Sequence, residues 1–206
     1  MARAYVQAGS RVILTNTFGA NRVRLAETGY ADQINALNRA GVEISQRAAG
    51  EQAAVFASIG PSGKMLMTGE VTAEELSAAF TEQAEALARA GADALVVETM
   101  SDLEEAQLAL TAARATGLPV VACMVFDAGK DKDRTMMGQT PEQVAAALTA
   151  AGADVIGANC GQGIAGFVPI CRRLRAATDR PLWLKPNAGL PQLADGRATY
   201  TTTPEE

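Results

Sequence analysis

Junctions of one kind recur along this 206-residue chain, each made of alanine and glycine directly before an apolar run. They are Ala8-Gly9-Ser10, Ala90-Gly91-Ala92-Asp93 and Ala151-Gly152-Ala153-Asp154. Glycine is favoured where a helix ends, because it takes left-handed backbone angles at little cost, and a short apolar run is typical of a buried strand. A helix end followed by a buried strand, repeated along one chain, indicates βα units joined into a parallel sheet.

Alternating apolar and amphipathic segments support this interpretation. Runs rich in Val and Ile, each short enough for a buried strand, lie at residues 11–16, 54–59, 94–98, 120–126, 155–159 and 182–185. Ala-rich amphipathic stretches predict helices at residues 74–90, 103–115, 141–151 and 168–178. Thr72 stands three residues before Glu75, the spacing of a capping box, and Thr140 precedes a proline suited to the first helical position.

The domain organisation follows from the absence of any linker or low-complexity segment. Residues 1–206 are interpreted as one α/β domain, either a barrel or an open doubly wound sheet. Polar residues gather where the predicted strands end: Asn16-Thr17, Glu98-Thr99, Asp127, Asn159-Cys160 and Asn187. Such a ring of polar groups favours the barrel, whose active site is built from the carboxyl ends of many strands.

Composition narrows the function classes. The net charge of -5 argues against a nucleic-acid or anionic-membrane surface, so a small-molecule partner is expected. No apolar run approaches the length of a membrane span, and the three cysteines, an odd number, suggest reduced thiols, so we expect a cytoplasmic protein. The chain has no histidine, and any metal or nucleophile chemistry must therefore use sulfur, carboxylates or a bound cofactor.

Five ordered motifs carry a resemblance to a known family. They are Thr15-Asn16-Thr17-Phe18-Gly19-Ala20, Ser58-Ile59-Gly60-Pro61-Ser62-Gly63, Glu98-Thr99, Gly157-Ala158-Asn159-Cys160-Gly161 and Pro186-Asn187-Ala188-Gly189-Leu190-Pro191. In this order they resemble the homocysteine S-methyltransferase family over nearly the whole chain. The resemblance implies a (β/α)8 TIM barrel and zinc-dependent methyl transfer to the thiol of homocysteine, giving methionine. It also implies a zinc ion held by three cysteine thiolates, of which Cys160 matches the first.

The implied zinc chemistry is physically reasonable, because coordination removes the thiol proton and leaves the nucleophilic thiolate. The resemblance further implies that Glu98 holds the amino group of the substrate, whereas the alternative is a charged strand end that faces solvent. Asn159 and Asn187 are candidates for the substrate pocket or for turn positions, and Asn16 and Thr17 carry the same ambiguity.

Each cysteine, and one charged loop, also has a structural interpretation. Cys160 could by itself be a structural cysteine, but its five-residue motif favours the ligand position. Cys123 lies in an apolar strand and Cys171 on an Ala/Leu-rich helix, so packing roles are expected for both. The mixed-sign run at residues 130–134 predicts a solvated loop.

Departures from the family pattern indicate an incomplete barrel. The pattern begins with an Asp-Gly-Ala motif on its first strand, whereas this chain starts at what resembles the helix before the second strand. The pattern ends with Gly-Gly-Cys-Cys, which supplies the other two zinc ligands and has no counterpart before residue 206. We therefore expect strands 2 to 7 of the barrel, one zinc ligand of three, and a central fragment of the catalytic domain.

Two segments of the chain bear on the identity of the methyl donor. Residues 133–140 and 186–191 resemble the cobalamin-dependent methionine synthase branch, which implies a methylcorrinoid donor on a separate domain or protein. Two alternatives stay open. One is a corrinoid-protein-linked methyltransferase that acts on another acceptor, and the other is an inactive barrel fragment.

Overall fold

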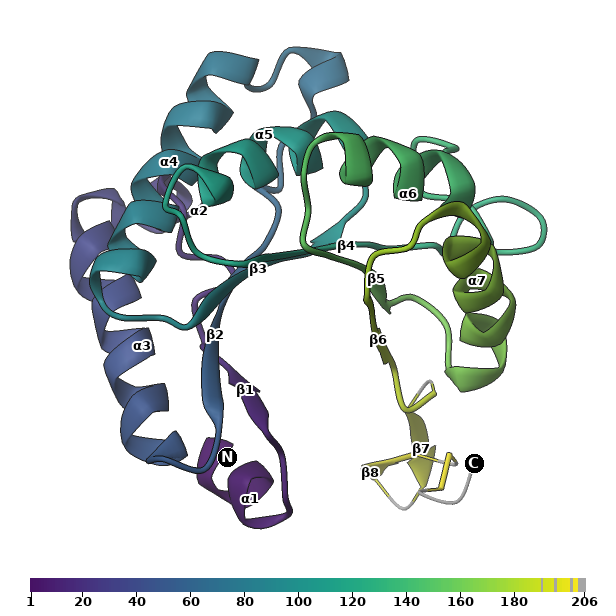
Figure 1. Ribbon diagram of the computed structural model, residues 1–206, viewed down its shortest axis with the longest axis horizontal. Coiled ribbons are helices and arrows are strands. Elements are labelled where there is room, and N and C mark those ends of the chain that lie inside the picture. Colours follow the sequence, from purple (N-terminus) through teal and green to yellow (C-terminus); the bar gives the residue numbers. More distant parts are fainter. Residues whose placement is uncertain (190, 195, 201, 204–206) are drawn as a thin grey trace.

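The computed structural model describes residues 1–189, 191–194, 196–200 and 202–203. Its centre is a six-stranded parallel sheet in which every strand pairs with the next one along the chain. The strands are β1 (Val12–Leu14), β2 (Ala54–Ile59), β3 (Ala94–Met100), β4 (Val120–Met124), β5 (Val155–Cys160) and β6 (Leu182–Pro186). Figure 1 shows the sheet curled like part of a barrel wall, with the helices along its outer side.

The other elements connect and flank these strands. The helices are α1 (Ala2–Gln7), α2 (Arg22–Glu27), α3 (Ile34–Ala49), α4 (Ala73–Arg89), α5 (Leu103–Arg114), α6 (Pro141–Ala150) and α7 (Ile164–Ala177), with 3-10 turns η1 (Ala31–Gln33) and η2 (Leu66–Thr68). A small antiparallel hairpin of β7 (Gln192–Ala194) and β8 (Arg197–Thr199) follows β6. Unbroken strand order with outer helices is an incomplete TIM barrel, so the predicted fold class is confirmed.

All six predicted strands are present; the second, Ala54–Ile59, has the predicted bounds, and the others have shifted ends. The first shortens to Val12–Leu14, and the third continues through residue 98 to Met100, which pairs with Met124 of β4 after a register shift. The predicted helix at residues 168–178 instead begins at Ile164. No helix was predicted over Ile34–Ala49, because the stripe that this helix buries includes the polar residues Asn38 and Ser45.

Helix starts are formed as the sequence predicts. Thr72 Oγ1 accepts from the backbone N–H of Glu75 at 3.1 Å, and Glu75 Oε2 accepts from the backbone N–H of Thr72 at 2.9 Å. The same reciprocal pair joins Thr140 and Gln143 at 3.2 and 2.9 Å, with Pro141 at the first helical position. Because each box satisfies two otherwise unpaired donors, α4 and α6 start at defined residues.

The aspartates of the repeated junctions fasten the amino-terminal ends of neighbouring strands. Asp93 Oδ2 accepts from the Val55 N–H at 2.7 Å, and the Asp93 N–H donates to the Val55 carbonyl at 2.9 Å. Asp154 repeats this arrangement on Val120 at 2.9 and 3.0 Å. Each aspartate thereby fixes the register between its own strand and the preceding one, at the edge of the sheet opposite the strand carboxyl ends.

The two faces of the sheet bury different residues. The outer face carries the main core, in which Leu95 and Val97 of β3 pack with Phe80 of α4 and Leu110 of α5. Residues pointing the other way form a second cluster, which consists of Val96, Val121 and Cys123 flanked by Leu14, Phe56, Val155 and Trp183. The concave face of the sheet is therefore filled by its own side chains at the amino-terminal end.

One aromatic contact crosses this concave face. The rings of Phe56 in β2 and Trp183 in β6 stack with centroids 5.9 Å apart and an interplanar angle of 22°. Since three strands separate β2 from β6 in the sheet order, the contact requires the curvature that Figure 1 shows. Aromatic stacking adds to the area that these rings bury, so the pair helps to hold the sheet curled.

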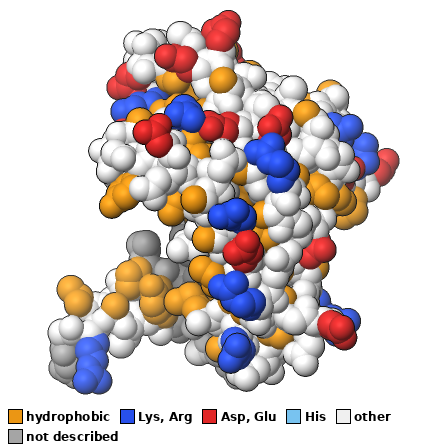
Figure 2. Space-filling view, turned by 90° about the vertical axis from the view of Figure 1, so that its left-hand side faces the viewer, with side chains coloured by type: hydrophobic (Ala, Val, Ile, Leu, Met, Phe, Trp, Pro, Cys, Tyr) orange, Lys and Arg blue, Asp and Glu red, His pale blue; other side chains and the backbone are white. Residues whose placement is uncertain are grey.

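The outer surface agrees with the charge of the chain. On the face that Figure 2 shows, acidic and basic side chains alternate with small apolar patches, without an extended basic area. Within the described ranges, no helix combines the length and the apolar character that crossing a bilayer requires.

Candidate functional site

Glu98 is a buried carboxylate near the carboxyl end of β3. It is 6% exposed, and both of its oxygens have partners. The Ser58 hydroxyl donates to Oε1 at 2.6 Å, and Lys185 Nζ donates to Oε2 at 2.6 Å. These donors come from β2 and β6, on either side of β3, so the predicted solvent-facing alternative for Glu98 does not describe its position. A charge this buried is tolerated because it is paired and hydrogen-bonded.

An irregular backbone follows Glu98. The ladder between β3 and β4 shifts register between Val97 and Met100, and Thr99 has a left-handed φ of 62°. A β-branched residue reaches such an angle only where the surroundings impose it, and bulges near strand ends often redirect side chains into sites.

Asn159 supplies those surroundings. This residue is 1% exposed. Its Oδ1 accepts from the Thr99 N–H at 2.8 Å, and its Nδ2 donates to Thr99 Oγ1 at 2.7 Å. Nδ2 also lies 3.2 Å from Cys160 Sγ, and Thr99 Oγ1 lies 3.7 Å from the same sulfur. One amide therefore joins the ends of β3 and β5 and places two polar atoms against the sulfur.

Cys160 is half-buried at the last position of β5, and it too has a left-handed φ, of 58°. It is less buried than Cys123, which lies inside the concave cluster. Burial raises the pKa of the Cys123 thiol, and the nearby Glu98 carboxylate raises this pKa further. Cys123 thus occupies the packing position predicted for it.

The first glycine of the Cys160 motif, Gly157, is required by close strand packing. A Cβ on Gly157 would lie 1.9 Å from the Trp183 carbonyl oxygen and 2.8 Å from Cys123 Sγ. Strand β5 can approach its two neighbours this closely only because residue 157 has no side chain.

Thr17 is buried and hydrogen-bonded, whereas the neighbouring Asn16 is exposed. Thr17 Oγ1 donates to the Ser58 carbonyl at 2.7 Å and lies 2.6 Å from Thr15 Oγ1, which in turn accepts from the Ser58 N–H at 3.0 Å. Since Thr17 uses its one hydroxyl proton on the carbonyl, Thr15 donates to Thr17. These threonines tie the loop after β1 to Ser58, the residue that donates to Glu98.

Asn187 lies just after β6 and is exposed. Its Nδ2 donates to the Gly161 carbonyl at 3.0 Å, which connects the loop after β6 to the loop after β5. The structure therefore gathers Glu98, Asn159 and Cys160 closely and places Asn187 beside Gly161, while Asn16 stands on the β1 side of the sheet.

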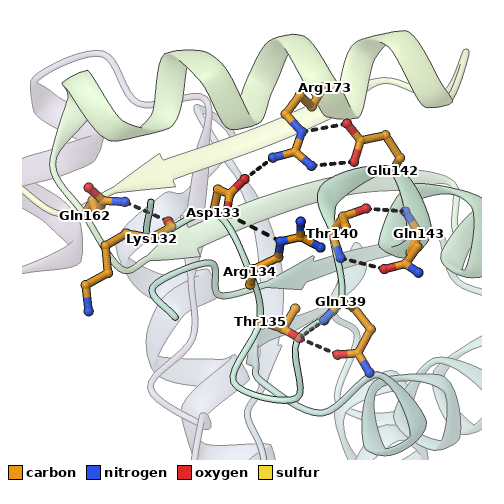
Figure 3. A network of polar contacts seen from close by, with 10 residues as sticks. All are labelled: Lys132, Asp133, Arg134, Thr135, Gln139, Thr140, Glu142, Gln143, Gln162 and Arg173. Carbon is orange, nitrogen blue, oxygen red and sulfur yellow. Dashed lines mark hydrogen bonds and ion pairs between the residues drawn. The ribbon is translucent and has the colours of Figure 1, made fainter. Parts of the chain in front are cut away.

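A charged network anchors the long connection between β4 and α6 (Figure 3). Arg173 of α7 donates through Nε and Nη2 to the two oxygens of Glu142 at 2.6 and 2.8 Å, and it also contacts Asp133. Gln162, just after β5, donates to the Lys132 carbonyl at 2.8 Å. The run 130–134 was expected to be a solvated loop, but Asp133 is only partly exposed and is paired, because α7 presents a guanidinium to it.

Metal binding depends on how many donor side chains the fold brings to one point. Among the residues that the structure describes, no three cysteine, aspartate or glutamate side chains converge on a point where they could hold a metal ion. Cys160 thus has no second cysteine ligand beside it among the described residues, which do not fit a complete zinc centre.

Comparison with known proteins decides the family. The homocysteine S-methyltransferase profile matches residues 1–206. The chain belongs to the homocysteine S-methyltransferase family. A methionine synthase from Mycobacterium tuberculosis is 33% identical over 219 residues, which cover 99% of this chain and 18% of that protein. Betaine–homocysteine S-methyltransferase 1 of Sus scrofa is 33% identical over 163 residues, covering 77% of this chain and 56% of that enzyme.

A solved homocysteine methyltransferase has a similar fold. The metallated form of the homocysteine methyltransferase MmuM from Escherichia coli aligns with a TM-score of 0.77 at 25% identity, covering 91% of this chain and 70% of that chain. This chain spans 18% of the length of the mycobacterial methionine synthase, so it corresponds to one part of that larger protein.

Three residues at the candidate site had no individual role predicted from the sequence. Ser58 and Lys185 bind Glu98, and Thr99 contacts Cys160. Alternation along β6 carries a signal for Lys185, because it lies two residues after Trp183 and so points to the same side of the sheet. Ser58 and Thr99 occur within the family motifs, but their partners lie on other strands and have no local signature.

Proposed function

We propose that this chain binds homocysteine and takes part in methyl transfer to its thiol, which gives methionine. Family membership supports the reaction class. The observation that carries the proposal is the buried Glu98 carboxylate, one residue from Thr99, whose hydroxyl lies 3.7 Å from Cys160 Sγ. An anionic group and a half-buried cysteine then lie at the same end of the sheet, as an amino acid with a thiol requires.

Each proposed site residue has a distinct task. Glu98 binds the substrate ammonium, and Asn159 holds Thr99 and Cys160 in their left-handed conformations. Asn187, exposed beside Gly161, and Asn16, exposed at the other side, lie where they could meet the substrate or donor at the rim. Thr17 acts from beneath by supporting Ser58.

The bond changes in the proposed reaction are simple. The homocysteine thiol gives up its proton to solvent, its sulfur forms a bond to the methyl carbon, and the donor leaves with the electron pair of the broken carbon–donor bond. Cys160 is proposed as one sulfur donor of a zinc site that would favour the thiolate form of the substrate. The described residues do not complete that site. A methylcorrinoid on another domain or protein is the proposed donor.

Methionine formation tests this function directly. The purified chain is supplied with L-homocysteine and, in turn, methylcobalamin, betaine or S-methylmethionine, and methionine is quantified by mass spectrometry. Homocysteine binding is measured in parallel by calorimetry. Glu98→Gln removes the negative charge of the ammonium site and should weaken homocysteine binding by roughly tenfold or more, since hydrogen bonds to charged groups contribute about 1.5–3 kcal/mol.

Glu43→Gln is the matched control, because Glu43 is an exposed carboxylate on α3 outside the site. If the chain neither binds homocysteine nor forms methionine with any of the three donors, the proposed function is wrong. Methyl transfer to a different thiol but not to homocysteine would assign the chain to another acceptor.

A further inference from the structure

The contact between Glu98 and Lys185 places a positive and a negative group side by side on the concave side of the sheet. Lys185 Nζ lies 2.6 Å from Glu98 Oε2, although the residues belong to β6 and β3. The two side chains differ in accessibility, since 44% of the Lys185 side chain is exposed and only 7% of that of Glu98. A ligand that approaches Glu98 therefore also meets the lysine.

Both groups retain unused hydrogen-bonding capacity. An ionised carboxylate offers about four lone-pair positions, and Glu98 uses two of them on Ser58 and Lys185. An ammonium has three donor hydrogens, and Lys185 directs one to Glu98. Lys185 can donate to a further partner, and Glu98 can accept from one, without breaking the contact between them.

Charge balance determines which ligand suits this pair. Glu98 and Lys185 neutralise each other, so a ligand that brings only an ammonium would put two cations beside one buried carboxylate. Like charges held close together repel, and the repulsion opposes binding. A ligand that carries its own carboxylate next to its ammonium restores neutrality, because its carboxylate can face Lys185 while its ammonium faces Glu98. The α-amino acid group has this arrangement.

The orientation of the pair agrees with the rest of the site. Thr99 follows Glu98 in β3 and contacts Cys160 through its hydroxyl. Lys185 is paired in register with Asn159, the residue before Cys160. An amino-acid group on the Glu98–Lys185 pair would thus have the sulfur of Cys160 within the neighbouring part of the same site.

We propose that Lys185 binds the α-carboxylate of the substrate and makes the site selective for α-amino acid thiols over simple aminothiols. This inference rests on the proposed function, in which Glu98 binds the substrate ammonium. Lys185 is then a specificity-determining residue, and the lysine and the glutamate together form the site for the two charges of the amino acid.

Ligands that lack one charge test the proposal. Calorimetry on the chain compares L-homocysteine with homocysteamine, which lacks the carboxylate, and with γ-mercaptobutyrate, which lacks the ammonium. Lys185→Met should weaken L-homocysteine by roughly 10- to 100-fold, the loss expected for one hydrogen bond between charged groups, and should abolish the binding of γ-mercaptobutyrate. Homocysteamine should bind Lys185→Met at least as tightly as it binds the wild type, because the competing cation is gone.

Three further variants control for charge, for specificity and for loss of the fold. Lys185→Arg keeps the positive charge and should retain the preference for L-homocysteine over homocysteamine. Lys130→Met removes an exposed lysine of the β4–α6 connection and should leave all three affinities unchanged. Circular dichroism confirms that each variant is folded, and the double variant Glu98→Gln/Lys185→Met avoids an unpaired buried carboxylate if the single variant unfolds. In that background, L-homocysteine should have no advantage over homocysteamine.

The outcomes separate the two claims. If the wild type binds L-homocysteine and Glu98→Gln weakens it while Lys185→Met does not, the role of Lys185 is refuted and the proposed function stands. Equal tightening of L-homocysteine and homocysteamine by Lys185→Met would show that the lysine only competes for Glu98, which also refutes the inference. If the wild type does not bind L-homocysteine, both claims are wrong.

Discussion

Asn159 holds Thr99 by two hydrogen bonds at once, accepting from its backbone N–H at 2.8 Å and donating to its hydroxyl at 2.7 Å. The pair joins β3 to β5 across the intervening β4. Because Thr99 has a left-handed φ of 62°, this contact maintains a conformation that the residue would not adopt in a free chain. The geometry around Cys160 therefore depends on one buried amide.

Replacing that amide should destabilise the chain. Asn159→Ala leaves the Thr99 N–H buried without its acceptor, and a buried unsatisfied donor costs about 1–3 kcal/mol. Chemical denaturation monitored by circular dichroism measures the change in the free energy of unfolding. Asn35→Ala is the control, because the exposed Asn35 accepts only a surface hydrogen bond from Arg89. Equal stability of the two variants would refute the role given to Asn159.

The missing side chain at residue 157 gives a second prediction. Gly157→Ala would place a Cβ 1.9 Å from a backbone carbonyl oxygen, which cannot move as a side chain can. Overpacking of this kind costs about 1–3 kcal/mol or more, so we expect a large fall in the thermal midpoint or loss of the fold. Gly19→Ala should be close to neutral, since the nearest atom to its Cβ is the end of the flexible Arg24 side chain at 3.6 Å. A wild-type midpoint for Gly157→Ala would contradict the packing described for β5.

The network around Arg173 predicts a defined acid response. Hydrogen bonds from Arg173 lower the pKa of Glu142 from its ordinary 4.5 to about 2. A carboxyl group whose pKa falls on folding stabilises the folded state above its unfolded pKa, and this contribution disappears as the pH falls from about 4.5 to 2. The pair is partly exposed, so solvent screening limits the contribution to roughly 1 kcal/mol or less.

Arg173→Met should remove this part of the acid response. Thermal melts at closely spaced pH values from about 2 to 5 can detect the loss, because this range spans the folded and unfolded pKa values of Glu142. Arg89→Met removes an exposed pair within α4 and serves as the control. If the two variants lose the same stability across this range, the contribution of Glu142 is not specific to Arg173.

Of the three cysteines, two should react readily with thiol reagents and one should not. Cys160 and Cys171 are partly accessible, whereas Cys123 is buried and its thiol pKa is raised by that burial. A thiolate is the reactive form, so Cys123 should resist modification in the folded chain. With Ellman's reagent at neutral pH, we expect two thiols to react under native conditions and the third only after denaturation. Rapid reaction of all three would contradict the packing of the concave cluster.

Local sequence chemistry was a reliable guide to much of the fold. Gly9, Gly91 and Gly152 all have positive φ angles, as expected for glycines at helix ends. The capping box of Thr72 and the helix start at Thr140 also formed where predicted. These features depend on residues within one turn of each other, and neighbouring residues are what a sequence displays.

Contacts between distant strands were beyond such reasoning. The family motifs singled out Glu98, Asn159 and Cys160 as candidates, but Lys185, which donates to Glu98, lies on a distant strand, and the two residues meet only because the sheet curls. The aspartates of the repeated junctions were visible in the sequence, yet their hydrogen bonds to the neighbouring strands depend on a register that only the assembled sheet defines. Helix α3 was missed for another reason, since it buries Asn38, whose amide satisfies two backbone carbonyls.

The stack of Phe56 on Trp183 has a practical consequence. Trp183 is the single tryptophan of the chain, and its ring lies against a residue from the opposite side of the curled sheet. The intrinsic fluorescence of Trp183 should therefore depend on the curvature of the sheet, so no attached dye is needed to follow it. Any binding partner or solvent condition that straightens the sheet will separate the rings and shift the emission, so the protein reports its own curvature.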